Sequence, residues 1–397
     1  MASHTVMSLP PMAPFPKAAW RARIVPEEWA ACLDAWILLA EAHLSFSAAD
    51  FKRILAKDDS ISAFLLSYMS EAALSPDIAS FGDPPRWKKL WKQCFLLANR
   101  LFHVEQPPGN IIRWEFLSDF CKVYGKARSM KAISSLWIGS RVVLERVFSA
   151  LKTSLVENLE SGIKGSPSEL EQKLKRLNHL LHCSPETATF FMNGSDFLDG
   201  LVSCYKLMNP PLRKAIISTT YLSLIGLTEG YTQRVSLLTD QLYALKAEAD
   251  AHKAGPLNAN DSLVAELVTV TPILKQIQGR IGSSANGAGR VKSVIVSLEG
   301  FRKAGGGRPK RPFKRNIDKG KGLASSHEEY GHGTSGQIHV HQMSLITQVQ
   351  DLFPDLGSGF VMKLLDEYGE NVELVISHLL EGSLPAHLQN ADHSETM

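Results

Sequence analysis

The side chains that most often carry out chemistry occur in this 397-residue chain without the spacing that such chemistry needs. A thiol–imidazole pair could be drawn from Cys94 or Cys121 with His103, but no local signature of a cysteine nucleophile surrounds them. A histidine cluster lies in a Gly-rich stretch, where metal binding would need a folded cage and further ligands: His332, His339 and His341. We therefore expect no catalytic residue, no metal site and no cofactor.

Other signatures of enzymes, zinc sites and membrane proteins are missing from the sequence as well. It has no G-x-x-x-x-G-K-[ST], G-x-S-x-G or H-E-x-x-H motif. Its five cysteines include no C-x-x-C pair, which argues against a disulfide framework or a structural zinc site and favours a reducing compartment. Apolar runs are shorter than the roughly 18–20 residues that cross a bilayer, and prolines interrupt the N-terminus. We therefore expect neither a membrane span nor a secretory signal.

Helical periodicity covers residues 24–282, which should form the larger folded body. All seven tryptophans lie within the first 137 residues, and such large side chains need a substantial core. An apolar stripe with i, i+3, i+4 spacing follows Pro26, which suits a first helical position, and a second stripe follows Ser166. Strand-like alternation is scarce. The pattern predicts an all-α body, preceded by a disordered tail at 1–23.

Composition changes at residue 283. The stretch 283–342 is rich in Gly, Ser and basic residues and has too few apolar side chains to offset chain-ordering entropy, so we predict a flexible basic linker. Nine Lys or Arg and one acid between Arg302 and Lys321 make a local charge of +8, which leaves −5 for the rest of a chain of net charge +3. Nuclear import, nucleic-acid contact and a merely solvated linker are the three interpretations. The candidate residues are Arg308, Lys310, Arg311, Lys314 and Arg315.

Helical periodicity returns at 343–388, in three short pieces. The pieces 344–352 and 358–368 each align apolar residues on one face. The third piece begins after Asn371, the expected N-cap, and ends before Gly382. Three helices in so short a stretch predict a compact bundle near the lower size limit for independent folding. Residues 389–397 are expected to be a disordered tail.

A core this small uses nearly every apolar residue available, so the apolar residues left over are informative. At about 100° per residue, Leu380 lies roughly 40° beyond Ile376, at the margin of the buried stripe. Phe353 and Pro354 directly follow the first helix, where proline prevents the helix from continuing. Together these residues could form one exposed apolar patch, and such patches usually mark a partner site.

The segments Leu352-Phe353-Pro354, Asp355-Leu356-Gly357 and Leu379-Leu380 resemble those of a CUE domain, a three-helix, UBA-like module that binds ubiquitin. Leu352 replaces a common methionine of that family and keeps its volume and apolarity. The resemblance implies ubiquitin contacts from Leu352, Phe353, Pro354, Asp355, Leu379 and Leu380. Leu352 and Leu379 have core packing as an alternative role, and a related three-helix fold without ubiquitin affinity is the alternative for the whole module.

The sequence of residues 345–360 is similar to that of one group of CUE-containing adaptor subunits, which also have a helical body before a polar linker. This likeness implies a non-enzymatic adaptor in the nucleus and cytoplasm that reads polyubiquitin, with preference for lysine-sixty-three-linked chains. Its body is expected to dock on a large helicase subunit and bring it to alkylation damage or stalled ribosomes. The alternative is a nucleic-acid-associated scaffold or transcription coactivator acting through the basic linker. Members of that group continue well past the CUE domain, so this chain is expected to be a short form.

Overall fold

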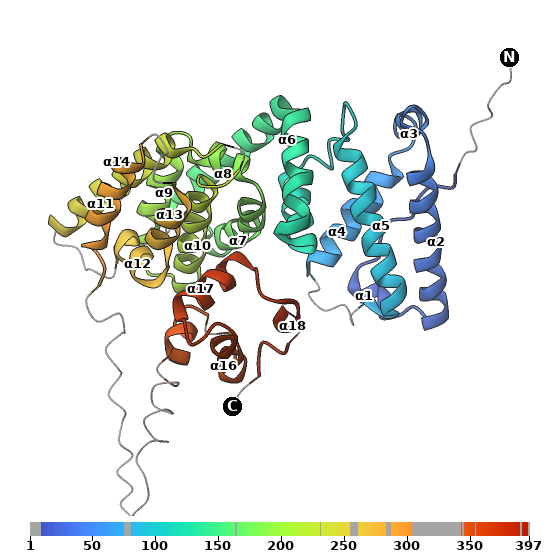
Figure 1. Ribbon diagram of the computed structural model, residues 1–397. Coiled ribbons are helices and arrows are strands. Elements are labelled where there is room, and N and C mark those ends of the chain that lie inside the picture. The colour runs from blue at the N-terminus through green and yellow to red at the C-terminus, as the bar shows by residue number, and fades with distance from the viewer. Residues whose placement is uncertain are drawn as a thin grey trace, which may run out of the picture.

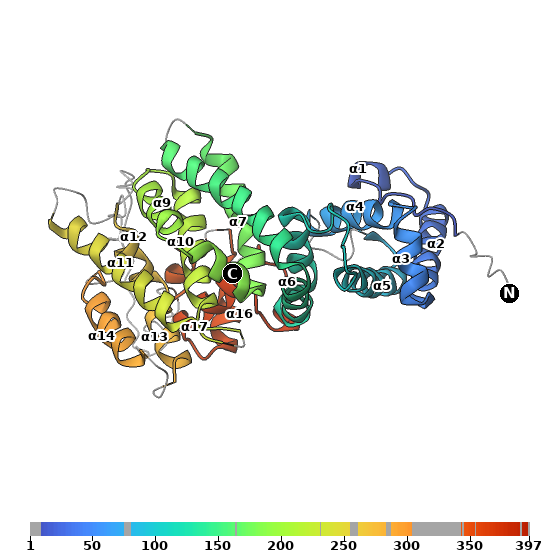
Figure 2. The same ribbon diagram turned by 90° about the horizontal axis from the view of Figure 1, so that it is seen from above.

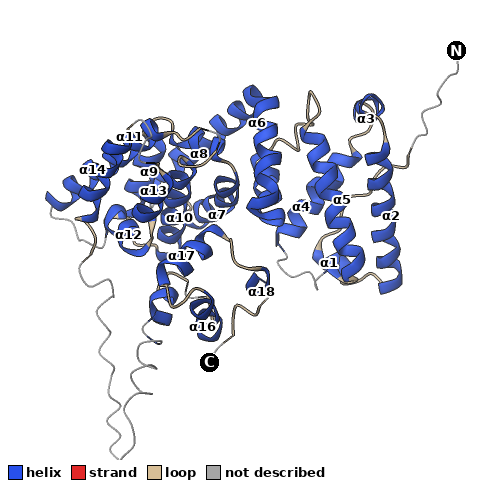
Figure 3. Cartoon of the chain, viewed as in Figure 1, coloured by secondary structure: helices blue, strands red, loops and turns tan. Residues whose placement is uncertain are grey.

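Every regular element in the described part of the chain is a helix, which confirms the all-α prediction (Figure 3). The computed structural model describes residues 9–74, 81–162, 165–230, 232–254, 261–282, 287–303, 343, 345–353, 355–389 and 391–395. The helices of the body are α1 (Ala18–Arg21), α2 (Pro26–Ser45), α3 (Ala48–Leu55), α4 (Ser60–Leu74), α5 (Pro84–Phe102), α6 (Trp114–Ser161), α7 (Pro167–Cys183), α8 (Pro185–Met192), α9 (Asp196–Tyr205), α10 (Pro210–Gly226), α11 (Val235–Ala254), α12 (Leu263–Val270), α13 (Ile273–Arg280) and α14 (Ala288–Glu299).

The body is elongated. Helices α1 to α5 form one end, α7 to α14 form the other, and α6 connects them (Figures 1 and 2). Helix α6 is bent where its backbone leaves helical geometry, at Gly125 (φ 67°, ψ 169°) and Ser140 (φ −130°, ψ 29°). Glycine suits the first bend because it adopts positive φ without a steric penalty. No described helix, including the 48-residue α6, is long and apolar enough to cross a bilayer.

Side-chain caps and prolines determine where several helices begin. Ser47 accepts a hydrogen bond from the Asp50 backbone N–H at the start of α3. Asn209 caps α10 in the same way, directly before two prolines that cannot continue a preceding helix. Ser166 precedes α7 but makes no side-chain capping bond, so Pro167 in the first turn is the stronger start signal there.

The expected tail at 1–23 is corrected by the structure, in which residues 9–23 belong to the body. Met12 is 1% exposed and Phe15 is 3% exposed. The ring of Phe15 lies 5.4 Å from that of Trp36 and 5.4 Å from that of Tyr68, edge-on to the tyrosine. The Trp36 indole donates a hydrogen bond to the Ala13 carbonyl at 3.0 Å. Aromatic burial therefore orders a Pro-rich segment whose composition predicts disorder.

The expected linker boundary at residue 283 is corrected as well. Helix α14 buries Val291, Val294 and Leu298 in the core of the body. Beyond it, the Lys303 backbone N–H donates to the Thr269 hydroxyl at 3.0 Å, and the Lys303 ammonium pairs with Glu266. The body therefore extends to Lys303, and residues 304–342 of the predicted linker lie outside the described residues.

Burial of Phe15 leads to a test of the corrected N-terminal boundary. Phe15→Ala should lower the free energy of unfolding of the full chain by about 3–5 kcal/mol, because it empties the centre of an aromatic cluster. Trp20→Ala is the matched control: Trp20 is 68% exposed, so its loss should change stability by less than about 0.5 kcal/mol. Urea unfolding followed by tryptophan fluorescence measures the first effect, and circular dichroism measures both. Equal stability of the two variants would contradict this boundary.

Candidate functional site

The C-terminal module is a small helical bundle with its own core, as the periodicity predicts. Its helices are the segment 345–350, α16 (Ser358–Glu367), α17 (Val372–Glu381) and the short α18 (Ala386–Gln389). The buried side chains of this core are Ile346, Val349, Phe360, Val361, Leu364, Leu365, Val375, Leu384 and Leu388. Asn371 caps α17 by accepting from the Leu374 backbone N–H, and Gly382 ends it with φ 60°.

The expected C-terminal tail at 389–397 is corrected for residues 391–395, which pack on α16. The Gly357 backbone N–H donates to the His393 carbonyl at 2.8 Å, and the rings of Phe360 and His393 lie 4.4 Å apart. A Cβ atom added at Gly357 would lie 2.0 Å from the Glu395 carbonyl oxygen. Only glycine allows this segment to cross the start of α16 so closely.

The loop after helix 345–350 carries three of the described candidate contacts. The backbone N–H groups of Leu352 and Phe353 both donate to the Val349 carbonyl, at 3.1 and 3.0 Å, so the loop continues directly from the helix. Phe353 is half-buried and packs against the bundle core, Leu352 is half-buried, and Asp355 is exposed. Pro354 lies outside the described residues. The loop therefore presents the partly accessible ring of Phe353 beside an exposed carboxylate.

The two leucines near the end of α17 face different cores. Leu379 is half-buried against the core of its own bundle, which agrees with the alternative of a structural role. Leu380 is half-buried against the core of the helical body. The structure thus places Leu380 off the bundle's own stripe, as the 100° geometry predicts, but another part of the same chain partly covers it.

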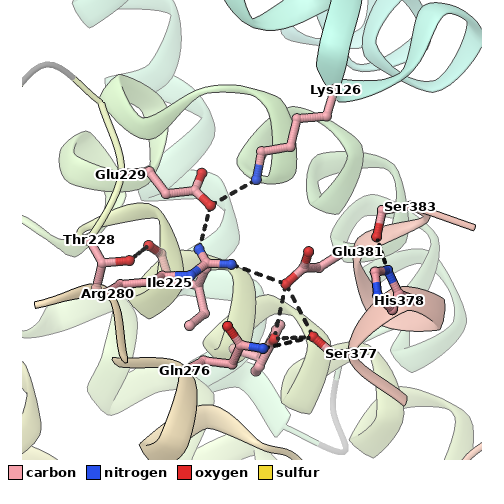
Figure 4. Close-up of polar contacts among 11 residues, drawn as sticks. Lys126, Ile225, Thr228, Glu229, Gln276, Arg280, Ser377, His378, Glu381 and Ser383 are labelled. Atoms are coloured by element: carbon pink, nitrogen blue, oxygen red, sulfur yellow. Dashed lines mark hydrogen bonds and ion pairs between the residues drawn. The ribbon is translucent and has the colours of Figure 1, made fainter. Parts of the chain in front are cut away.

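Polar contacts surround this junction between α17 and the body (Figure 4). Tyr221 of α10 is fully buried, and its hydroxyl lies 3.2 Å from the Ser377 hydroxyl and donates to the Glu381 carboxylate at 3.2 Å. From α13, the Gln276 amide donates to the Ser377 hydroxyl at 3.4 Å, and Arg280 donates to Glu381 at 3.4 Å. Each such bond contributes about 0.5–1.5 kcal/mol net.

Charges connect the junction to α6. Glu229 accepts from Arg280 and, at 2.8 Å, from Lys126 of α6, so two cations and two carboxylates form a row that ends at Glu381. Burial, together with the nearby Lys126, His179 and Arg280, lowers the pKa of His182 to about 3. The His182 imidazole is therefore neutral near pH 7 and adds no positive charge beside Arg280. Burial also raises the pKa of Tyr221, so its hydroxyl keeps its proton.

Sequence reasoning missed this set of residues. Its hydrogen bonds between α17 and the body join residues 101 to 160 positions apart, and no local period connects them. One signal was present on α17. At 100° per residue, Glu373, Ser377 and Glu381 fall within about 80° of one another, on the stripe that also carries Leu380. Ser377 is polar yet only 3% exposed, which marks a second contact face.

The remaining chemical candidates contribute no site in the described part of the chain. Cys94 and Cys121 are buried, and burial raises the pKa of both thiols, so neither is a ready nucleophile. No group of three or more His, Cys, Asp or Glu side chains within the described ranges could hold a metal ion. The candidate basic residues and the histidine cluster lie outside the described residues: Arg308, Lys310, Arg311, Lys314, Arg315, His332, His339 and His341.

Comparison with known proteins supports the C-terminal resemblance. A family model described as "CUE domain" matches residues 342–383. Activating signal cointegrator 1 complex subunit 2 from Mus musculus is 36% identical over 77 residues, which cover 19% of this chain and 10% of the relative. The Homo sapiens protein of the same name is 45% identical over 51 residues, 13% of this chain and 7% of the relative. No solved structure matches the chain.

These matches cover a tenth or less of the length of both curated relatives, and a fifth or less of this chain. They agree with the geometry, because the segment matched as a CUE domain holds the loop with Leu352 and Phe353 and the whole of α17. The chain is therefore a CUE domain-containing protein that resembles activating signal cointegrator 1 complex subunit 2 over part of its length.

Proposed function

We propose that the protein is a ubiquitin-binding adaptor without catalytic activity. Its ubiquitin contacts are assigned to the six residues implied by the family resemblance: Leu352, Phe353, Pro354, Asp355, Leu379 and Leu380. The observation that carries the proposal is the CUE match at 342–383, which contains both the loop and the leucine pair that the resemblance requires. A three-helix module of this kind functions by binding, so no reacting groups are needed.

The chemistry of this surface supports weak binding. Phe353 and Leu380 are half-buried, so each offers only part of its apolar area to a partner. The fixed entropic cost of association offsets much of what so small a contact contributes. We expect an affinity for a single ubiquitin in the micromolar range or weaker.

Weak binding to one ubiquitin suits recognition of a chain. Linked ubiquitins raise the local concentration of binding partners at the CUE domain without any new contact. We propose polyubiquitin as the physiological ligand, with preference for lysine-sixty-three-linked chains, as the family resemblance implies. Competition between these and lysine-forty-eight-linked chains of equal length tests the preference, and equal affinities would reject it.

For the helical body we propose docking on a large helicase subunit, in alkylation-damage repair or ribosome quality control, in the nucleus and cytoplasm. Support comes from the names of the two relatives, which describe each as a complex subunit. Exposed apolar residues on α6 are consistent with a docking role: Ile138 is 80% exposed, and Val142, one turn later, is 71% exposed. The test is to purify the full chain from cells and identify the proteins that copurify with it. Absence of a helicase among them would reject this part of the proposal.

The basic segment keeps the alternative of a nucleic-acid-associated scaffold or coactivator open as a second prediction. Its support is the local charge of +8 between Arg302 and Lys321. Phosphate contacts release counterions and weaken steeply as salt rises, whereas an apolar ubiquitin contact hardly responds. If the alternative holds, the affinity of the full chain for a single-stranded oligonucleotide should fall at least tenfold between 50 and 200 mM salt. A fall of about this size is expected when a few phosphates are neutralised.

Ubiquitin binding itself is tested by titrating the full chain into isotope-labelled ubiquitin. Phe353→Ala combined with Leu380→Ala should weaken binding by at least tenfold, equivalent to about 1.4 kcal/mol, because both apolar contacts are lost. Chemical shifts of ubiquitin report the interaction. Hydrogen exchange of α16 and α17 reports whether the bundle remains folded in the double variant.

Leu374→Ala is the matched control, since Leu374 is on α17, is 40% exposed and is not among the six assigned residues. Its binding should equal that of the unmodified chain. Unchanged ubiquitin spectra at millimolar concentrations of every variant would reject the proposed function. Loss of exchange protection in the double variant would instead show that Phe353 and Leu380 are needed for folding of the bundle. The titration is then repeated with Phe353→Leu, which keeps the packing, in place of Phe353→Ala.

A further inference from the structure

We propose that the α10–α13 face of the body and ubiquitin compete for the same face of α17. The arrangement seen here is then a closed state, which must open before the CUE domain can bind ubiquitin. This inference rests on the proposed function and concerns how ubiquitin binding is regulated.

Leu380 is half-buried at the junction with the body. Leu380 belongs to the leucine pair assigned to ubiquitin, yet it packs against the core of the body. Its neighbour on the same stripe, Ser377, is 3% exposed, and Tyr221 opposite is fully buried. A second protein cannot reach Ser377, or the part of Leu380 that faces the body, in this arrangement. Full contact between ubiquitin and Leu380 therefore requires α17 to separate from the body.

One residue of the CUE loop, Asp355, also lies near α10. Burial lowers the pKa of Lys214 on α10, and the negative charge of Asp355 acts on that ammonium in the opposite direction. Asp355 is thus close enough to α10 to influence its charge. Asp355 of the loop and Ser377 and Glu381 of α17 therefore lie near the same helix of the body.

The character of the junction makes the closed state reversible. Its contacts are mostly polar, and water can replace each of these after separation: Tyr221–Ser377, Tyr221–Glu381, Gln276–Ser377, Arg280–Glu381 and Lys275–Glu373. The Lys275–Glu373 pair is well exposed, so it adds little to the closed state. Residues 304–342 keep the separated CUE domain attached to the body. The closed state then outweighs the open one by about tenfold, and a ligand of the open state shifts the balance.

The first experiment opens the junction in the full chain. Tyr221→Phe keeps the buried ring but leaves Ser377 and Glu381 without its hydroxyl, and Arg280→Ala removes the cation beside Glu381. Because the competent fraction limits apparent affinity, each variant should bind isotope-labelled ubiquitin about three- to tenfold more tightly than the unmodified chain. Hydrogen exchange of 372–381 without ubiquitin should become faster in both.

Lys126→Ala is the matched control, since Lys126 contacts the same Glu229 as Arg280 but has no contact with α17 among those described. Its ubiquitin affinity should stay within about twofold of the unmodified chain, because the closed state keeps its own contacts. Circular dichroism establishes that all three variants are folded. If Arg280→Ala alone is misfolded, Tyr221→Phe, the more conservative change, decides the result.

The second experiment holds the junction closed. In a Cys32→Ser background, which removes the half-buried cysteine, Lys275→Cys and Glu373→Cys are joined by a short bismaleimide across the ion pair that they replace. The joined protein should bind ubiquitin at least tenfold more weakly than the same protein before joining, since the open fraction falls. Equal binding by the joined, unmodified and opened proteins would overturn the inference and leave the proposed function standing. If even the opened variants fail to bind ubiquitin, the proposed function fails, and this inference with it.

Discussion

Helix α17 is ten residues long and must bury side chains on two sides of its axis. Val375 and Leu379 pack in its own bundle, whereas Ser377, Leu380 and Glu381 meet the body. A helix with 3.6 residues per turn can supply two such stripes only if few positions remain for solvent. The attachment of the module and the accessibility of its proposed ubiquitin surface both depend on this double use.

The two sides of α17 are held by different forces. On the bundle side, apolar burial dominates, which is non-directional and tolerates substitution by residues of similar volume. On the body side, a single leucine is surrounded by hydroxyl, amide, guanidinium and carboxylate groups, which require particular geometry and exchange readily with water. The bundle is therefore the more durable unit, and its contact with the body is the one that changes with conditions.

Local features of the fold could be predicted from the sequence, and non-local ones could not. The caps at Ser47 and Asn371 and the end at Gly382 follow from residue type within a few positions. The burial of Phe15 and the docking of α14 do not, because short Pro-rich and Gly-flanked segments lack the periodicity that would reveal them. The loop and leucine pair were found through a family resemblance, but their relation to Tyr221 depends on contacts across 156 to 160 residues.

Because α17 covers part of the body, removal of the CUE domain would alter the remaining fragment. A shortened chain ending at Lys303 would present to water the apolar area beneath Leu380 and the hydroxyl of Tyr221, both of which are covered in the full chain. Newly exposed apolar surface promotes self-association and nonspecific binding of other proteins. Truncated forms used in binding experiments should therefore keep α17. A fragment that lacks α17 would bind unrelated proteins through this exposed surface in addition to its true partners.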